Sequence, residues 1–286
     1  MRTVSAPVDQ SVRTARARPA RAARLVGDVP ALEPRSGSLS ARYARILDRH
    51  HPATVFVSAA LLGYVSLVAF TVGLGFLVTK LLITTDGIGR DDEHFVSWLV
   101  SHRSPSLTDA SLIGSIIAGG VVIPTVVGVV AAGLACLRKW RAAAFLIAAI
   151  GLEAATYRLT IVFVHRQRPD VPRLEHLQAN ASYPSGHTAA AIAVYAGLAL
   201  LITSRFRGRA VAVVCWTVAI VIPPFVAMAR MYRGMHHPLD SGAAVFVGIG
   251  ALLIALFAAR AAGAAADARE RSRVDGSTRA APEART

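Results

Sequence analysis

Long runs of uncharged, apolar residues dominate this chain and restrict what it can fold into. The first extends from Thr54 to Thr79, and a helix of that length crosses a bilayer core of about 30 Å. Five further apolar runs lie at residues 110–137, 142–164, 188–204, 210–229 and 241–259, and the run at 142–164 contains two charged residues, Glu153 and Arg158. Because lipid leaves no partner for exposed backbone polar groups, these runs predict an all-α bundle of six transmembrane helices.

The composition agrees with a membrane protein. Of the 286 residues, 54% are hydrophobic and 17% are charged, whereas an ordinary soluble domain is about 25% charged. The formal net charge is nevertheless +14, so basic residues must be concentrated in loops and tails. Cys136 and Cys215 both lie in apolar runs, where buried free thiols are expected, and two cysteines cannot form a disulfide framework.

Two segments flank the predicted membrane domain, residues 52–259. Residues 1–51 contain ten arginines, and their composition predicts a disordered basic tail. Residues 260–286 form a second charged tail. Because aromatic residues are not interleaved with the arginines, we expect the basic tail to face anionic membrane lipids and not nucleic acid.

Basic residues also predict the orientation. Six spans place both tails, the turn at 138–141 and the turn at 205–209 on one side, and each of these segments carries Arg or Lys. The positive-inside rule assigns that side to the cytoplasm. The arginine bias and the outward loops indicate a bacterial cell membrane. In the first outward loop, residues 94–100 are expected to lie as an amphipathic segment at the interface.

The outward loops hold three groups of reactive side chains, which make this face the predicted active site, since ionisable residues at a membrane are functional candidates. The groups are Arg166 with Arg168; Ser185, Gly186 and His187; and Arg230, His236 and Asp240. The arginine forks suit phosphate oxygens. Ser185 and Gly186 lie at a loop-to-helix junction, where free N–H groups favour an anion and a glycine permits close approach.

His236 and Asp240 are four residues apart and share a helix face if Pro238 opens a helix. A carboxylate bonded to one imidazole nitrogen leaves the other nitrogen free to attack phosphorus. His187, on another helix, would protonate the leaving oxygen. The three groups together indicate phosphoryl transfer without a metal. A metal site at His236, His237 and Asp240 is the less favoured alternative.

At these residues the chain resembles the type 2 phosphatidic acid phosphatase superfamily. Its motifs are a lysine seven residues before Arg-Pro, then Pro-Ser-Gly-His, then Ser-Arg followed by His and Asp at fixed spacing. Here Arg168-Pro169, the tetrapeptide Pro184 to His187, and Arg230 with His236 and Asp240 match in order. The similarity, with the six spans, covers roughly residues 54–259.

The resemblance implies a role for each matching residue. His236 would form a phosphohistidine, Asp240 would orient it, and His187 would act as acid and then base. The phosphate oxygens would be held by Arg168, Arg230, Ser185 and Gly186. Neither a metal nor another cofactor is required.

Two positions depart from the family pattern. Ile161 occupies the lysine position and Ala229 the serine position, so one phosphate contact is missing. Arg158, one helical turn before Ile161, is our candidate replacement, and Arg166 is a second.

The expected function is therefore metal-independent hydrolysis of a lipid phosphate or diphosphate. Candidate substrates are phosphatidic acid, phosphatidylglycerol phosphate and undecaprenyl diphosphate. A lipid-phosphate transporter, a haloperoxidase-like enzyme and a catalytically impaired lipid-binding relative are the alternatives. The sequence leaves the choice of lipid and the oligomeric state open.

Overall fold

The computed structural model describes residues 29–85, 87–175 and 181–280, and this part of the chain is all-helical, without strands. Within it, five helices are long and apolar enough to cross a membrane, and there are six such spans if a bent pair of shorter helices is counted as one. The single spans are α3 (Pro52–Leu77), α7 (Trp140–Phe163), α8 (Gly186–Arg205), α9 (Arg209–Tyr232) and α10 (Pro238–Ala280). The predicted all-α membrane bundle is therefore confirmed.

The second predicted span is broken. It comprises α5 (Pro105–Ile117) and α6 (Val122–Cys136), which meet at an angle of 40°. The break contains Gly119 and Gly120, which have a low helix propensity. Beyond the break the two halves take different neighbours, because α5 packs on α9 whereas α6 packs on α7.

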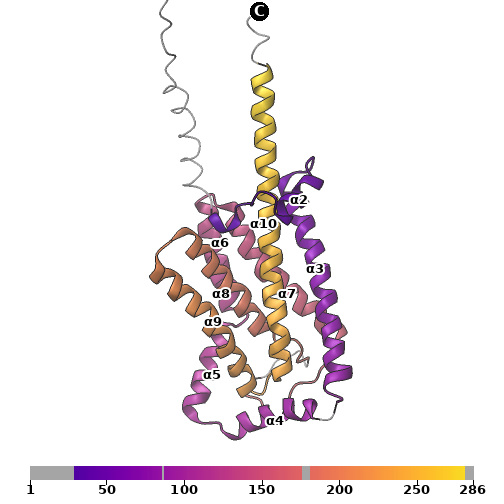
Figure 1. Ribbon diagram of the computed structural model, residues 1–286. Helices are drawn as coiled ribbons and strands as arrows, with labels where there is room; N and C mark the ends of the chain where they lie inside the picture. Colours follow the sequence, from indigo (N-terminus) through magenta and orange to yellow (C-terminus); the bar gives the residue numbers. More distant parts are fainter. Residues whose placement is uncertain (1–28, 86, 176–180, 281–286) are drawn as a thin grey trace, which may run out of the picture.

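Helix α10 packs against α3, α7 and α8 and runs along the bundle and out beyond one end of it (Figure 1). Small residues make these close contacts possible, as in other membrane bundles. Ala244, Ala251 and Ala255 are fully buried. A Cβ atom added at Gly248 would lie 2.7 Å from the Cβ of Ile192 on α8, so the two helices approach too closely for a larger residue.

The flanking segments differ from the expectation. Residues 29–51, expected to be disordered, contain the 3-10 turn η2 (Pro30–Leu32) and helix α2 (Leu39–Ile46). Helix α10 does not end at Ala259 but continues to Ala280. Ala44 of α2 packs with Ala261 and Ala265 of α10, so burial of small apolar side chains orders both segments. The rest of the predicted tails, residues 1–28 and 281–286, lies outside the described residues.

The candidate site residues lie at the end of the bundle where α4 (Ile88–Ser101) is found, opposite α2 (Figure 1). The predicted amphipathic segment 94–100 is part of α4. Arg103 fixes this end, since its guanidinium donates to the carbonyl oxygens of Tyr232 (2.8 Å) and Pro172 (2.8 Å). The connection after α4 is thereby tied to the end of α9 and to the loop between α7 and α8.

Candidate active site

A cavity of about 590 Å³ lies between the α5–α6 break, α7 and the start of α8. Most of the predicted site residues line it: Arg158, Arg168, Gly186, His187, Arg230 and His236. Gly119 and Gly120 of the broken span line it as well. The cavity therefore joins a cationic, histidine-containing end to a mainly apolar part of the bundle interior, where the buried Glu153 also lines it. The other predicted residues, Ser185, Arg166 and Asp240, are buried outside this lining.

Arg230 presents an unused pair of donors. Its side chain is fully buried, and its Nη1 donates to Ser115 Oγ (2.5 Å) and to Glu175 Oε2 (2.6 Å). Its Nε and Nη2 have no hydrogen-bond partner among the described residues. These two nitrogens form one edge of the guanidinium fork, which matches two oxygens of a phosphate. Because unsatisfied buried donors are costly, this edge indicates an anion-binding position.

Glu175 holds the other end of that guanidinium. Its Oε1 accepts hydrogen bonds from Arg233 Nε (2.5 Å) and Ser115 Oγ (2.7 Å). Partial burial would raise the pKa of Glu175, but Arg230 and the hydrogen bonds outweigh it and lower the pKa to about 2. The carboxylate is therefore ionised at neutral pH and fixes the position of Arg230.

His236 is held by a backbone carbonyl. Its Nδ1 lies 2.7 Å from the carbonyl oxygen of Ser182. A carbonyl only accepts, so Nδ1 carries the proton and Nε2 keeps its lone pair. Burial, followed by the nearby charge of Arg230, lowers the pKa of His236 well below its usual value. The imidazole is therefore neutral at neutral pH and can act as a nucleophile.

Asp240 anchors the residues around His236. Its Oδ2 accepts from the backbone N–H of His237 (2.8 Å) and from Ser182 Oγ, and it lies 3.9 Å from His236 Nδ1. The predicted direct bond to the imidazole is replaced by the Ser182 carbonyl. Asp240 thus contributes its charge and fixes Ser182, while its role toward His236 remains a prediction.

Arg166 is occupied by two carboxylates. Its Nη1 donates to Asp240 Oδ1 (2.5 Å), and its Nη2 pairs with Asp92 Oδ2 on α4. Asp92 Oδ1 in turn accepts from the backbone N–H of Leu239 (2.9 Å). Arg166 therefore links α4 to the start of α10 and lies outside the cavity lining, so Arg158 is the better placed of the two candidates for the missing lysine.

His237 belongs to the same network. Its Nε2 lies 2.8 Å from Glu93 Oε2, and its Nδ1 lies 3.2 Å from Asp240 Oδ2. Burial alone would lower the pKa of His237, but the hydrogen bond to Asp240 and that carboxylate's charge raise it. The imidazolium form is thus favoured between two carboxylates.

Gly234 shapes the turn that brings both histidines into place. It has a φ of 74°, a left-handed conformation that side chains rarely adopt. A Cβ atom at this position would lie 2.9 Å from Val171 Cγ2. The N–H of the next residue, Met235, turns back to the carbonyl of Arg230 (2.9 Å), so the loop reverses directly after the cavity arginine.

The start of α8 supplies Gly186 and His187 to the cavity. Ser185 is the N-cap residue, its Oγ lies 3.0 Å from Thr188 Oγ1, and its backbone N–H donates to the Asp240 carbonyl (3.2 Å). A Cβ atom at Gly186 would lie 3.3 Å from the Tyr157 ring. Nearby, Arg168 Nη1 donates to the carbonyl of Met235 (2.5 Å). The helix start and the loop before α10 are thus locked together.

Sequence reasoning missed several of these residues. Arg233 could have been found, since it lies three residues after Arg230 on the same helix face. Ser182 precedes the Pro-Ser-Gly-His motif by two residues, but its carbonyl carries no sequence signal. Glu175 and Ser115 meet Arg230 only in the tertiary structure, and no spacing indicates them.

The fold and this cavity define an α-helical, multi-pass membrane protein with a buried cationic site. A family model described as the PAP2 superfamily matches residues 142–263, so this part of the chain is similar to that superfamily. The matched segment contains the Arg-Pro, Pro-Ser-Gly-His and Arg–His–Asp positions.

Two solved structures are similar to the chain. A transmembrane PAP2-type phosphatidylglycerolphosphate phosphatase from Bacillus subtilis aligns with a TM-score of 0.56 and 23% identity, over 67% of this chain and 93% of its own. LpxE from Aquifex aeolicus aligns with a TM-score of 0.43 and 24% identity, over 56% of this chain and 92% of its own. The similarity to the Bacillus subtilis structure shows that the two proteins share a fold. No curated protein matches the chain significantly.

Proposed function

We propose that this protein hydrolyses a lipid phosphate or diphosphate through a phosphohistidine intermediate, without a metal. The observation that carries the proposal is the unpartnered Nε and Nη2 edge of the buried Arg230, in a cavity that His187 and His236 also line. An anion-binding fork, a neutral imidazole and a second histidine are the groups that phosphoryl transfer to histidine needs.

The first step uses the free nitrogen of His236. Nε2 attacks phosphorus, a bond from nitrogen to phosphorus forms, and the bond from phosphorus to the leaving oxygen breaks. His187 gives its proton to that oxygen, so the leaving lipid alcohol or lipid phosphate departs with its oxygen protonated. The Ser182 carbonyl, 2.7 Å from Nδ1, and the nearby Asp240 carboxylate stabilise the positive charge that develops on the ring.

The second step reverses these roles. His187, now without its proton, accepts one from water, and the water oxygen attacks phosphorus. The nitrogen–phosphorus bond breaks and inorganic phosphate is released. Arg168, Arg230 and the backbone N–H of Gly186 hold the phosphate oxygens in both steps, while the N–H of Ser185 is donated to the Asp240 carbonyl.

Arg158 supplies the phosphate contact that Ile161 cannot make. It lines the cavity together with Arg168, Arg230 and His236, whereas Arg166 is engaged by two carboxylates. The long aliphatic stem of Arg158 lets its charge reach the cavity from lipid depth on α7.

The shape of the cavity favours a lipid substrate. Gly119, Gly120 and Pro124 of the broken span line it, and Gly120 and Pro124 are exposed on the bundle surface. A phosphate at the arginines can therefore keep its hydrocarbon chain in the bilayer. Phosphatidic acid, phosphatidylglycerol phosphate and undecaprenyl diphosphate are the candidates, and the Bacillus subtilis protein of the same fold is a phosphatidylglycerolphosphate phosphatase.

We further propose that the protein lies in a bacterial cell membrane with the site facing outward and the basic turns in the cytoplasm. Fusion of a reporter enzyme to the C-terminus tests this, since only a cytoplasmic reporter should be active there. Activity of an exported reporter at the same position would reverse the orientation.

Phosphate release by the purified protein from the three lipids, with and without a chelator, tests the activity. His236→Ala should abolish release, while His94→Ala, on α4, serves as the matched control. Trapping of radioactive phosphate on the wild-type protein but not on His236→Ala identifies the phosphohistidine. Release that survives His236→Ala contradicts the mechanism, and release lost with the chelator contradicts its independence of metal.

Binding of all three lipids without phosphate release would instead indicate the impaired relative. Movement of an intact lipid phosphate between the leaflets of a vesicle would indicate the transporter.

A further inference from the structure

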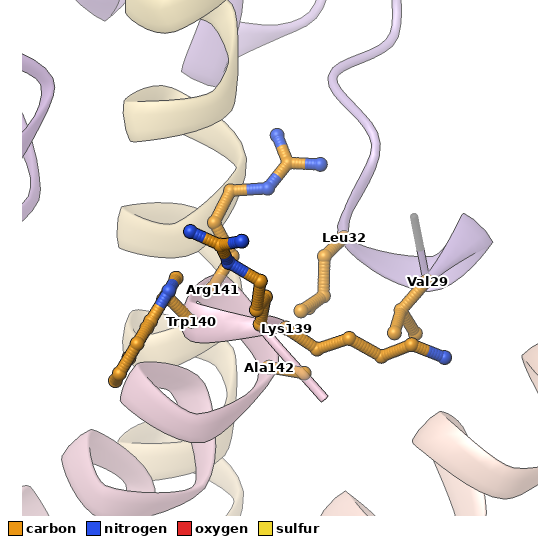
Figure 2. A pocket seen from close by; sticks show the side chains of 7 residues that line it. Val29, Leu32, Lys139, Trp140, Arg141 and Ala142 are labelled. Atoms are coloured by element: carbon orange, nitrogen blue, oxygen red, sulfur yellow. The ribbon is translucent and has the colours of Figure 1, made fainter. Parts of the chain in front are cut away.

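A second cavity lies at the end of the bundle opposite the candidate active site. It measures about 160 Å³ and lies between the turn joining α6 to α7 and the segment of η2. Figure 2 shows Lys139 reaching from the start of α7 toward Val29 and Leu32. The proposed catalytic mechanism gives this cavity no role.

The cavity is strongly cationic. Arg138, Lys139 and Arg141 line it, and none of the described residues in its lining is acidic. Arg138 and Lys139 are adjacent like charges, and the repulsion between them favours an anion bound beside them. Guanidinium and ammonium donors together suit the several oxygens of a phosphate group.

Arg138 occupies a backbone position that normally favours glycine. Its φ is 58°, in the left-handed region where helices commonly end on glycine. The N–H groups of Arg138 and Lys139 turn back to the carbonyls of Ala135 and Leu134, both at 2.8 Å. A glycine would make the same turn with less strain but would remove a cation from the cavity. The turn therefore carries a charged side chain at a backbone position that glycine would adopt with less strain.

The opposite wall of the cavity is held in place. Leu32 is almost completely buried and belongs to the main apolar core. The carbonyl of Ala31 accepts a hydrogen bond from Arg260 Nε on α10 (2.9 Å). The cations thus face an apolar wall that is held in place by hydrogen bonding and packing. The basic turn and this wall together form a cavity.

Large apolar side chains flank the cations. Leu137 is 68% exposed and Trp140 is 64% exposed, and tryptophan is typical of the membrane–water interface. We propose that this cavity binds the phosphate headgroup of an anionic phospholipid, with the acyl chains lying along Leu137 and Trp140. The cations provide the headgroup contact, and the exposed apolar residues favour a lipid over a soluble phosphate compound.

Calorimetric titration of the full-length protein in neutral detergent tests this proposal. The probes are dihexanoyl phosphatidylglycerol, dihexanoyl phosphatidylcholine and glycerol phosphate. Phosphatidylglycerol is a phosphodiester, so the proposed phosphatase site should not consume it. The test variant is Arg138→Gln with Lys139→Gln, and the control is Arg207→Gln with Arg209→Gln, which removes two exposed cations at the same end of the bundle.

The wild type should bind phosphatidylglycerol more tightly than the other two probes. Loss of two lipid-facing cations should weaken that binding about 30-fold in the test variant, and the control should bind as the wild type does. Equal weakening in both variants, or unchanged binding in the test variant, overturns the site. Glycerol phosphate binding as tightly as phosphatidylglycerol overturns its assignment to a lipid. These binding measurements do not depend on phosphatase activity.

Discussion

Glu175 and Arg230 are joined by a buried ion pair, with Oε2 of the carboxylate 2.6 Å from Nη1 of the guanidinium. The pair uses one end of the arginine and leaves the Nε and Nη2 edge without a partner. A carboxylate on the far end of this arginine fixes the direction in which the arginine presents its remaining donors.

Glu175→Gln should weaken substrate binding because Arg230 loses its charged partner. Hydrogen bonds to charged groups contribute about 1.5–3 kcal/mol, so kcat/KM should fall about 10- to 100-fold, mainly through KM. Glu175→Asp should restore part of the loss, and Asp91→Asn, which removes an exposed carboxylate from α4, should have no effect. A lower KM in Glu175→Gln would show that the carboxylate competes with substrate instead.

Arg158→Ala tests the replacement of the missing lysine. Loss of one charged contact to phosphate should raise KM about tenfold or more, and Arg158→Lys should retain much of the affinity. Arg90→Ala, an exposed arginine on α4, is the control for charge alone. If kinetic constants are unchanged in Arg158→Ala, the proposed contact does not exist.

The pH dependence of kcat/KM should report His236. Burial and Arg230 lower its pKa, so the neutral nucleophile persists to a lower pH than a free imidazole, whose pKa is about 6.5. The acid limb of the kcat/KM profile should therefore lie below that value. An acid limb at or above it would contradict a neutral, buried His236.

The stability of the folded protein should depend on His237. Because the pKa of His237 is raised by Asp240 and Glu93, its ion pairs stabilise the fold below the unfolded value of about 6.5. This contribution is lost as the pH rises through the higher folded pKa. In detergent, the midpoint of thermal unfolding of the wild type should fall as the pH rises through this range. The midpoint of His237→Gln should depend less on pH. An equally steep profile in that variant would assign the dependence to another group.

Gly234→Ala should destabilise the turn before His236. A left-handed backbone costs a side-chain-bearing residue roughly 1–2 kcal/mol, and the added Cβ would lie 2.9 Å from Val171. Gly242→Ala is the matched control, since nothing lies within 4 Å of a Cβ there and alanine favours the helix. Thermal unfolding should show a lower midpoint for the first variant alone, and equal midpoints would refute the role of the turn.

The apolar runs predicted the spans well because helix formation in lipid depends on local composition. A charge-free run of sufficient length must form a helix to satisfy its own backbone. Dependence on local composition also explains one wrong prediction. Composition alone predicted that residues 29–51 are disordered, but Ala44 packs with Ala261 of α10. That contact joins residues more than two hundred positions apart, and no local pattern indicates it.

The sequence by itself determined the all-α class, the membrane spans and the end of the bundle at which Arg168, His187, Arg230 and His236 would meet. The tertiary structure alone decided their partners. Helix packing brings Ser115, Glu175 and Arg230 together from three separate segments, and it places the Ser182 carbonyl, not Asp240, against His236. Spacing along a chain fixes which residues share a helix face, but which donor meets which acceptor across helices depends on how the helices pack.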